Sequence, residues 1–367
     1  MEKKSKSNPL NFFYNKKIVI TGINGFKGFW LCLLLQNLGA KVTGIGLKNS
    51  NFPILDKINF EKKIFKNLDI NNFKKLKSYI ASKNPDVIFH LASESLVYKC
   101  NLEPLKAFQT NVIGLTNLFI IIRDMKHKKN LSFNIVTSDK CYLPKNKKSY
   151  VENDELGGND IYSSTKAVQE VLANSFYKSY FQNKKNIYIT TLRAGNVIGG
   201  GDYSANRLFP DIYKSLLKNK KILIRNKNST RPWQHVLDTL NGYLLAASYA
   251  YKNKINFSNW NFSPNSTSYK VNDIIKILIR EKIINKKKVK YKKNIIKETK
   301  FLNLNPKKAN NLLKWKSFYN LKKSIKDTFV VYDVLNSRIN KKEKLNILKE
   351  KVKYFLKLAY GNSHRGK

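Results

Sequence analysis

The sequence predicts an α/β protein built on a doubly wound parallel sheet, followed by a smaller mixed α/β domain. The first two thirds of the 367 residues alternate short, β-rich apolar runs with helical patterns, as in strands joined by crossover helices. A glycine-rich turn follows the first apolar run, and the alternation stops after Gly195. A chain of this length buries a large core, so one large domain or two joined domains are expected.

Six apolar runs are expected to form the strands of the sheet. Ile18–Thr21 is a continuous run that ends at a glycine, as expected of a central strand covered on both faces. The other strands are expected at Val42–Ile45, from Ile64, and at Val87–Leu91, Asn134–Thr137 and Ile187–Arg193. The helices are expected at Phe26–Leu38, which Gly39 ends, and at Asn72–Ser82, Pro104–Asp124 and Ile161–Tyr180.

The domain boundaries follow from this pattern. Residues 1–194 are expected to form the sheet domain, which a return helix at 236–252 completes. Residues 195–235 and 253–336 contain short segments separated by Gly, Pro, Asn and Ser, and we expect them to form a second, substrate-binding domain. Residues 337–367 are charged and helix-capable, and we expect a C-terminal tail whose last residues fray.

The composition limits the classes of partner. An apolar content of 42% excludes a disordered chain. The net charge of +46 suggests nucleic acid, but 62 of the 70 basic residues are lysines spread along the whole chain, so no specific nucleic-acid partner is expected. Three cysteines form no disulfide framework and fit a reducing compartment. No apolar leader precedes the first strand, and Phe29–Leu35 is too short to span a membrane, so we expect a cytoplasmic protein without a membrane partner.

The turn from Thr21 to Gly28 predicts a dinucleotide site. Gly22, Gly25 and Gly28 lie where the first strand passes into the first helix. Such glycines let the backbone turn tightly and approach a pyrophosphate, whose charge the helix N-terminus favours. The alternative is a glycine turn that serves packing alone.

The adenosine end of this site is less sharply defined. Asp69 follows the third strand, where it is expected to hold the adenine or to cap the helix from Asn72. The second strand ends in Gly46-Leu47-Lys48, which offers no acid for a ribose hydroxyl. Lys48 is even compatible with a 2′-phosphate, so local sequence leaves NAD and NADP both open.

Tyr162 and Lys166 form the catalytic signal. They are four residues apart, so a helix presents both on one face. A nearby cation lowers the pKa of a phenol, which then accepts a proton from a sugar hydroxyl as hydride leaves the same carbon. Ser138, Asp139 and Lys140 end the fifth strand, at the rim where such sheets bind ligands.

Several longer stretches resemble a known family. They include Phe89–Ala92, Thr110–Gly114 and Val136–Tyr142, and the most distinctive are Arg193–Asp202 and Thr230–Val236. With the glycine turn and the Tyr-Lys pair, they make the chain from Thr21 to Trp315 similar to the extended short-chain dehydrogenase/reductases with a Rossmann-type sheet. Within that family the chain most resembles the CDP-glucose 4,6-dehydratases.

The resemblance implies a lyase that uses tightly held NAD on CDP-glucose. Tyr162 would deprotonate the C4 hydroxyl, Lys166 would tune the tyrosine and contact the nicotinamide ribose, and Ser138 would hydrogen-bond the reacting oxygen. Asp139 would be the acid at C6 and Lys140 the base at C5. A lysine is a base only when neutral, so its pKa must fall from ~10.4. The alternative for Lys140 is a solvated charge. The implied NAD contacts are Gly22, Asn24, Gly25, Phe26, Gly28, Asp69, Ile70, Leu91, Ala92, Asn111, Tyr162 and Lys166.

Arginine usage points to the substrate phosphates. Four of the eight arginines lie between Arg193 and Arg231, in a chain that otherwise uses lysine, and a planar guanidinium suits phosphate. We expect Arg207 and Arg231 to bind the pyrophosphate. The other expected substrate contacts are Arg225, Asn196 and Glu94, the last where the family usually has glutamine.

Three other titratable residues are expected to support the fold rather than the chemistry. Arg193, His90 and His235 are expected to be structural. No metal site is expected. Asn111 is expected to hold the catalytic helices in register.

Other functions remain open at this stage. Another nucleotide-sugar dehydratase, a 4-epimerase or a silent nucleotide-sugar binder would use the same scaffold. An epimerase has no use for an acid and base at C5 and C6, so Asp139 and Lys140 count against it. The resemblance also implies a homodimer through helices Pro104–Asp124 and Tyr162–Tyr180, and a place in deoxysugar supply for lipopolysaccharide O-antigen.

Overall fold

The computed structural model describes residues 8–48, 54–125, 129–145, 149–264, 268–292 and 303–361. Its centre is a seven-stranded sheet with the order β11-β6-β5-β4-β1-β2-β3, in which every pair is parallel. This confirms the predicted doubly wound sheet. The strands are β1 (Lys17–Thr21), β2 (Lys41–Gly46), β3 (Phe65–Asn67), β4 (Val87–His90), β5 (Leu131–Val136), β6 (Ile187–Ala194) and β11 (Phe257–Phe262).

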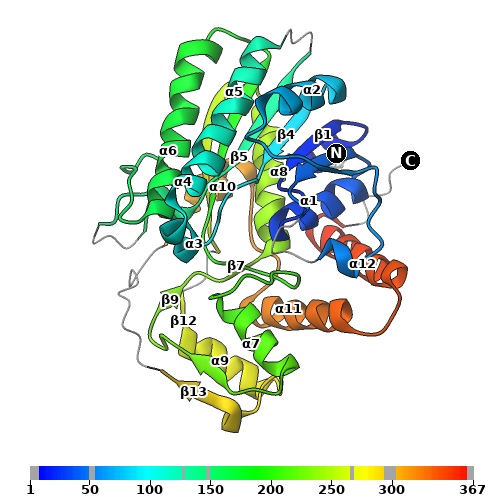
Figure 1. The fold of residues 1–367 in the computed structure, drawn as a ribbon, viewed down its shortest axis with the longest axis vertical. Coiled ribbons are helices and arrows are strands. Elements are labelled where there is room, and N and C mark those ends of the chain that lie inside the picture. Colours follow the sequence, from blue (N-terminus) through cyan, green and yellow to red (C-terminus); the bar gives the residue numbers. More distant parts are fainter. Residues whose placement is uncertain are drawn as a thin grey trace, which may run out of the picture.

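Two layers of helices bury the sheet (Figure 1). One face packs on α1 (Phe26–Asn37) and α8 (Val236–Lys252), and the other on α2 (Phe73–Lys83), α5 (Gly114–Asp124) and α6 (Ile161–Phe176). Strands β4 and β5 are buried along their whole length because both faces are covered. Gly39 ends the turn after α1 with a φ of +76°, a left-handed conformation that glycine adopts without strain.

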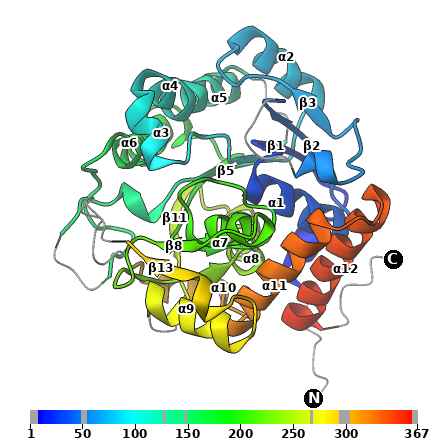
Figure 2. The same cartoon turned by 60° about the horizontal axis from the view of Figure 1, so that its bottom comes forward.

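A smaller region lies beyond the carboxyl ends of the strands and has its own core (Figures 1 and 2). That core includes Phe209, Ile274 and Phe329. The helices here are α7 (Leu208–Leu217), α9 (Val271–Arg280) and α11 (Leu321–Asn336). Short strands pair beside them, namely β7 (Val197–Ile198), β8 (Ile222–Ile224), β9 (Thr230–Arg231), β10 (Gln234–His235), β12 (Tyr269–Lys270) and β13 (Val289–Tyr291). Helix α10 (Lys307–Leu313) packs instead against α8 and β11 of the sheet domain.

The expected helix over Pro104–Asp124 is one continuous run with an irregular middle. It begins as α4 (Pro104–Phe108), passes through a π-helical turn at Gln109–Ile113 and continues as α5. A short helix, α3 (Val97–Leu102), precedes it. By length and composition this run is also apolar enough to cross a membrane, and half of its most apolar window is buried inside the protein.

Two segments differ from the sequence expectation. The range 253–336 was expected to belong wholly to the substrate domain, but β11 within it extends the sheet beyond β6. The range 337–367 was expected to form a charged tail, but α12 (Lys341–Tyr360) packs on α1 through an apolar stripe that includes Leu348, Val352 and Phe355. The expected fraying of residues 362–367 lies outside the described residues.

Candidate active site

The carboxyl ends of three neighbouring strands meet at one edge of the sheet. Thr21 of β1 pairs with His90 of β4, and His90 pairs with Ile135 of β5. The segments that follow these strands are therefore brought together: the glycine turn, Leu91-Ala92, and Thr137 with Ser138. The three sequence signals expected to form one site thus meet at this edge.

The glycine turn is closed tightly and leaves the start of α1 open. A Cβ on Gly28 would lie 2.1 Å from the carbonyl oxygen of Gly22, and a Cβ on Gly22 would lie 2.7 Å from the backbone nitrogen of Ala92. Gly25 caps α1 without a side-chain hydrogen bond, and no acidic residue lies in its first turn. The backbone N–H groups there are unused by side-chain caps, so the turn fits the pyrophosphate of a dinucleotide.

His90 holds the base of this turn rather than the ligand. Its Nδ1 is 2.7 Å from Oγ1 of Thr21, which also accepts a hydrogen bond from the Ala92 N–H at 3.2 Å. Burial lowers the pKa of His90 to about 3, so the ring is neutral. This agrees with the structural role expected of it.

The residues expected at the adenosine end of the cofactor make defined contacts within the protein. Asn24 donates through Nδ2 to the Leu47 carbonyl at 2.7 Å, which joins the glycine turn to the end of β2. Asp69 accepts hydrogen bonds from the Asn71 N–H and amide, and Asn72, not Asp69, caps α2. Ile70 packs where a Cβ on Gly114 would lie 2.3 Å from its Cδ1. The expectation that Asp69 caps α2 is therefore wrong.

Helix α6 carries Tyr162 and Lys166 on its buried face, at the same edge. The Lys166 ammonium donates to the Val136 carbonyl at 3.3 Å and to Oε1 of Gln169 at 2.9 Å, and its Nζ is 5.9 Å from the centre of the Tyr162 ring. Burial, followed by the charge of Lys27, lowers the pKa of Lys166 to about 7. Burial raises the pKa of Tyr162, and a hydrogen bond with Ser138 opposes that shift.

Ser138, Asp139 and Lys140 follow β5 directly opposite this helix. The Ser138 hydroxyl donates to Oδ1 of Asp139 at 2.8 Å and accepts the Lys140 N–H at 3.2 Å. Asp139 is 6% exposed, and its Oδ2 lies so close to Gly195 that a Cβ there would be 3.1 Å away. Burial raises the pKa of Asp139, while the charges of Lys140, Arg231 and Lys27 oppose that shift.

A buried ion pair fixes the spacing of these two segments. Glu170, one turn beyond Lys166, receives two hydrogen bonds from Arg193 of β6, at 2.9 and 2.7 Å. Thr137, directly before Ser138, donates to the same carboxylate at 2.5 Å. The pair joins β5, β6 and α6, and it assigns Arg193 the structural role expected of it.

Asn111 lies in the π-helical turn and joins three segments. Its amide donates to Thr165 of α6 at 2.9 Å, and its Oδ1 accepts the Ser93 hydroxyl at 2.7 Å and the Glu94 N–H at 2.8 Å. Its carbonyl accepts from Gln169. Asn111 thereby holds the helices in register. The same side chain is hydrogen-bonded to the backbone of Glu94.

The expected substrate residues differ in how they relate to Asp139 and Tyr162. Arg231 lies close enough for its charge to act on Asp139, and Arg207 acts in the same way on Tyr162. Asn196 is joined to β10 through its carbonyl, which accepts the Gln234 N–H. Arg225 is half-exposed and bonded to Asp211 at 2.7 Å, at the outer side of α7.

Two residues of the cluster have no counterpart in the sequence expectations. Lys27, in the first turn of α1, reaches toward Asp139 and Arg207, and its ammonium donates to the Tyr243 hydroxyl at 3.3 Å. Burial and Arg207 lower the pKa of Lys27 to about 8. Asp202 forms an ion pair with Arg207 at 3.0 Å and fixes it beside the site. The only sequence signal for Lys27 is its place between two glycines of the turn.

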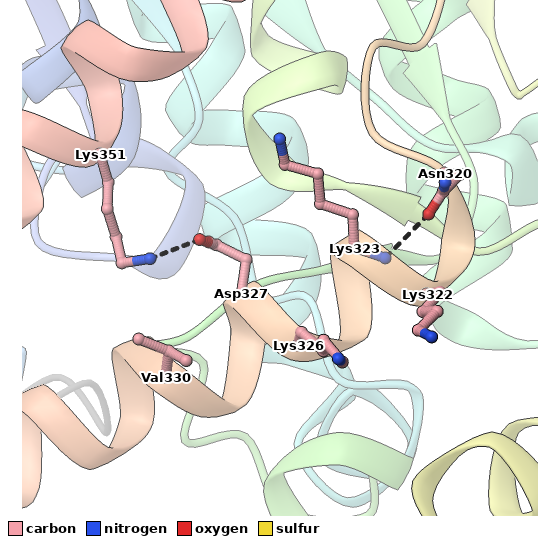
Figure 3. Close-up of a pocket in the computed structure, with 7 residues that line it drawn as sticks. All are labelled: Asn320, Lys322, Lys323, Lys326, Asp327, Val330 and Lys351. Carbon is pink, nitrogen blue, oxygen red and sulfur yellow. Dashed lines mark hydrogen bonds and ion pairs between the residues drawn. The ribbon is translucent and has the colours of Figure 1, made fainter. Parts of the chain in front are cut away.

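A hollow of about 360 Å³ lies elsewhere, between α11 and α12 (Figure 3). Asp327 points to Lys351 across it, at 2.5 Å, and contacts His235 at 3.2 Å. His235 caps α8 and is 1% exposed, so it has the packing role expected of it. The remaining lining residues are Asn320, Lys322, Lys323, Lys326 and Val330.

Comparison with known proteins places this geometry in a family. The model of the GDP-mannose 4,6 dehydratase family matches residues 19–328. The CDP-glucose 4,6-dehydratase of Salmonella typhimurium is 38% identical over 275 residues, 72% of this chain and 76% of that protein. The dTDP-D-glucose 4,6-dehydratase of Dictyostelium discoideum is 26% identical over 62% of this chain and 54% of its own.

Solved structures show the same fold. The dTDP-glucose 4,6-dehydratase of Bacillus anthracis, in complex with NAD, superposes with a TM-score of 0.72 at 22% identity, over 87% of this chain and 97% of that one. The UDP-glucose-4-epimerase of Stenotrophomonas maltophila gives a TM-score of 0.76 at 18% identity, over 86% and 97%. With the family match over most of its length, the chain belongs to the GDP-mannose 4,6 dehydratase family.

Proposed function

We propose that the protein is a CDP-glucose 4,6-dehydratase that converts CDP-glucose to the 4-keto-6-deoxy sugar nucleotide and water, with NAD as a bound catalyst. The observation that carries this proposal is the cluster of Ser138 and Asp139 with Tyr162 and Lys166 at one sheet edge. An acid beside the tyrosine-lysine pair suits the loss of water as well as oxidation. The 38% identity to the Salmonella typhimurium enzyme supports CDP-glucose as the substrate.

The cofactor would lie across the glycine turn. The N–H of Phe26 in the first turn of α1 is not taken by a side-chain cap and would face its pyrophosphate, and the close contact of Gly22 with Ala92 joins this turn to the segment after β4. Asn24, Asp69 and Ile70 lie toward its adenosine end. When bound, NAD supplies a hydride acceptor for C4 and a hydride donor for C6.

Tyr162 would accept the proton of the C4 hydroxyl, with Ser138 hydrogen-bonded to the same oxygen. Lys166 lies beside the phenol and favours its ionised form. The backbone contact of Lys166 with Val136 fixes the ammonium relative to β5, so the helix and the strand end present base and hydroxyl together. Oxidation would make C4 a ketone and the C5 hydrogen acidic.

Asp139 would donate a proton to the departing C6 hydroxyl, and Lys140 would remove the C5 proton. The burial of Asp139 favours its protonated form, which an acid requires. Lys140 directly follows Asp139 in the same turn, so both residues would act at the C5–C6 end of the sugar.

The substrate phosphates would be bound by Arg207 and Arg231. Both lie beside the cluster, and Asp202 fixes Arg207 in place. Asn196 and Glu94 would contact the sugar or its phosphate. Arg225 would contribute from farther out, because it is held by Asp211. We assign residues 195–235, 268–292 and 321–336 to the substrate domain, with β11 and α10 kept in the sheet domain.

The chain would act as a cytoplasmic homodimer in deoxysugar supply for surface polysaccharide such as O-antigen. Support for the dimer comes from the exposed apolar side chains on the helices expected to form its interface. Leu102 is 75% exposed, Leu105 71% and Ile113 50% on the run from α3 to α5, and Val171 is 53% exposed on α6. A second copy of the same helices would cover this surface.

The experiment offers CDP-, dTDP-, UDP- and GDP-glucose to the purified holoenzyme and measures the 4-keto-6-deoxy product. We expect product from the CDP sugar without consumption of added NADH. Asp139→Asn is the matched control, because it keeps the shape of the side chain and removes the acid. Product from another nucleotide alone would reassign the substrate, and a 4-epimer without water loss would refute the dehydratase.

A further inference from the structure

A glutamine of α6 joins Lys166 of the site to the π-helical turn. Gln169 follows Lys166 by three residues on the helix and is fully buried. Its Oε1 accepts a hydrogen bond from the Lys166 ammonium at 2.9 Å, and its Nε2 donates to the Asn111 carbonyl at 2.7 Å. Both ends of one buried amide are therefore used, and one of them holds a charge of the site.

The orientation of this amide is determined by the chemistry of its two partners. The Asn111 carbonyl is an acceptor, whereas the Lys166 ammonium is a donor. If the amide were turned over, two oxygens would face each other at one end and N–H donors would face each other at the other. Asn111 is itself held by bonds from its side chain to Thr165 and to the Ser93 hydroxyl. The π-helical turn therefore directs the oxygen of Gln169 toward the ammonium.

Two neutral oxygens bind the Lys166 ammonium. The bond to the Val136 carbonyl is 3.3 Å long, and the bond to Gln169 is shorter, at 2.9 Å. The carboxylate of Glu170, the next residue along the helix, is paired with Arg193. An ammonium has three N–H donors, so these two bonds leave one donor for the phenol or for a ribose of the cofactor. Gln169 thus supplies the shorter of the two bonds that hold this buried charge.

The titratable groups that face Lys166 come from several elements. They are Lys27 of α1, His90 of β4, Cys100 of α3, Cys141 after β5, and Tyr162 and Glu170 of α6 itself. Burial, and after it the charge of Lys27, opposes the charged amine and brings the pKa of Lys166 to about 7. A hydrogen bond that only the charged form needs acts in the other direction. Gln169 supplies such a bond without adding a negative charge to the site.

We propose that Gln169 is a positioning residue that fixes Lys166 beside Tyr162 and keeps its amine protonated. The Lys166 Nζ lies 5.9 Å from the centre of the Tyr162 ring. A lysine side chain is flexible, so a partner that binds its end determines where the charge lies. The inference rests on the proposed function, in which that charge favours the phenolate that accepts the C4 proton. An apolar residue in place of Gln169 would take one bond from the ammonium and one from the Asn111 carbonyl.

The first test measures the pKa of Lys166 directly and needs neither cofactor nor substrate, so it stands even if the proposed substrate is wrong. The full chain carries lysine labelled with carbon-13 at Cε, and Lys166→Arg identifies the Lys166 signal. Gln169→Leu should lower this pKa by about one unit, the size expected for loss of one hydrogen bond to a charged group. Gln169→Met, which is unbranched and similar in length, should lower it in the same way. An unchanged pKa would overturn the proposal.

Two further variants separate this role from packing. Gln169→Glu keeps the shape of the side chain and places a carboxyl group against the ammonium, so the pKa of Lys166 should rise. The matched control is Asn134→Leu, because Asn134 is a buried amide of β5 that donates to the Ile88 carbonyl and the Ser132 hydroxyl. In this control the pKa of Lys166 should stay unchanged. Shifts of one sign in Gln169→Leu and Gln169→Glu, or an equal shift in the control, would overturn the proposal.

The second test follows the reaction of the holoenzyme. CDP-6-deoxyglucose has no C6 hydroxyl, so the reaction stops after oxidation at C4, and absorbance reports the reduced cofactor. The rate should fall in alkali as Lys166 loses its charge, because the phenolate then has no cation beside it. Gln169→Leu should move that fall about one unit to lower pH and leave the affinity for the sugar nucleotide unchanged. A lowered pKa of Lys166 with an unmoved pH profile would support the hold of Gln169 on Lys166 and refute the role of Lys166 in the proposed function.

Discussion

The buried Glu170–Arg193 pair should contribute strongly to stability as well as to the geometry of the site. Both side chains are 2% exposed. Arg193 also donates to the Tyr142 hydroxyl at 2.6 Å and to the Glu152 carbonyl at 2.8 Å, so each of its three guanidinium nitrogens has a partner. Glu170→Gln leaves that guanidinium buried without its counter-charge. Removing one partner of such a pair costs about 3–5 kcal/mol, a large fraction of the roughly 5–15 kcal/mol that stabilises a typical domain.

The assay is equilibrium unfolding in denaturant, followed by tryptophan fluorescence. The matched control is Glu155→Gln, because Glu155 pairs with Lys145 at 2.7 Å on the surface, where both side chains are more than half exposed. We expect the midpoint to fall clearly for Glu170→Gln and to stay unchanged for the control. Equal and small effects in the two variants would refute the claim that this pair holds β5, β6 and α6 together.

The pH dependence of the same measurement has a defined sign. Burial opposes ionisation of Glu170, but the charge and hydrogen bonds of Arg193 outweigh it and lower the pKa of this carboxyl. A lowered pKa in the folded state gives stability that is present above the unfolded value of about 4.3 and is lost as the pH falls through the folded value. The difference between wild type and Glu170→Gln should therefore shrink in acid. A difference that stays constant below that range would contradict this assignment.

Four further predictions concern the site and its surroundings. Lys27→Met removes a charge that lowers the pKa of Lys166, so Lys166 should stay charged to higher pH and the pH profile of C4 oxidation should shift upward; an unshifted profile would contradict this. Gly28→Ala should weaken NAD binding measured by calorimetry at least tenfold, because its Cβ would lie 2.1 Å from the Gly22 carbonyl and force the turn open; unchanged affinity would contradict the cradle. Lys140→Ala should slow exchange of the C5 hydrogen with solvent while NAD binding stays intact, and normal exchange would remove Lys140 from its role. Leu105→Glu should convert a dimer to a monomer in sedimentation, whereas Leu217→Glu, on a leucine of α7 that is also more than half exposed, should not.

The sequence was sufficient for the parts of the fold that rest on apolar periodicity. Each of the six expected strands is present; β4, β5 and β6 are buried along their whole length, whereas β3, at the edge of the sheet, is largely exposed. Strand β11 was missed because Asn259 and Asn261 interrupt its apolar pattern, although Asn261 is buried by hydrogen bonds to Tyr142 and Tyr150. Partnered asparagines are not visible in a hydropathy pattern.

The site was predictable where spacing alone determines proximity. Tyr162 and Lys166 share a helix face, and the glycines of the turn have one compatible geometry. Lys27 was missed because one lysine among 62 carries no signal until the fold brings it to Asp139. The tether between Thr137, Glu170 and Arg193 joins residues from three elements, so only the tertiary structure shows it.

The most direct measurement follows the hydrogen that leaves C4. CDP-glucose carrying deuterium at C4 is converted by the holoenzyme in ordinary water, and the product is analysed by NMR. The account predicts deuterium at C6, because the same bound cofactor takes up the hydrogen and returns it within one turnover. Deuterium returned to C4 would indicate an epimerase, and loss of deuterium to solvent would contradict the proposed catalytic cycle.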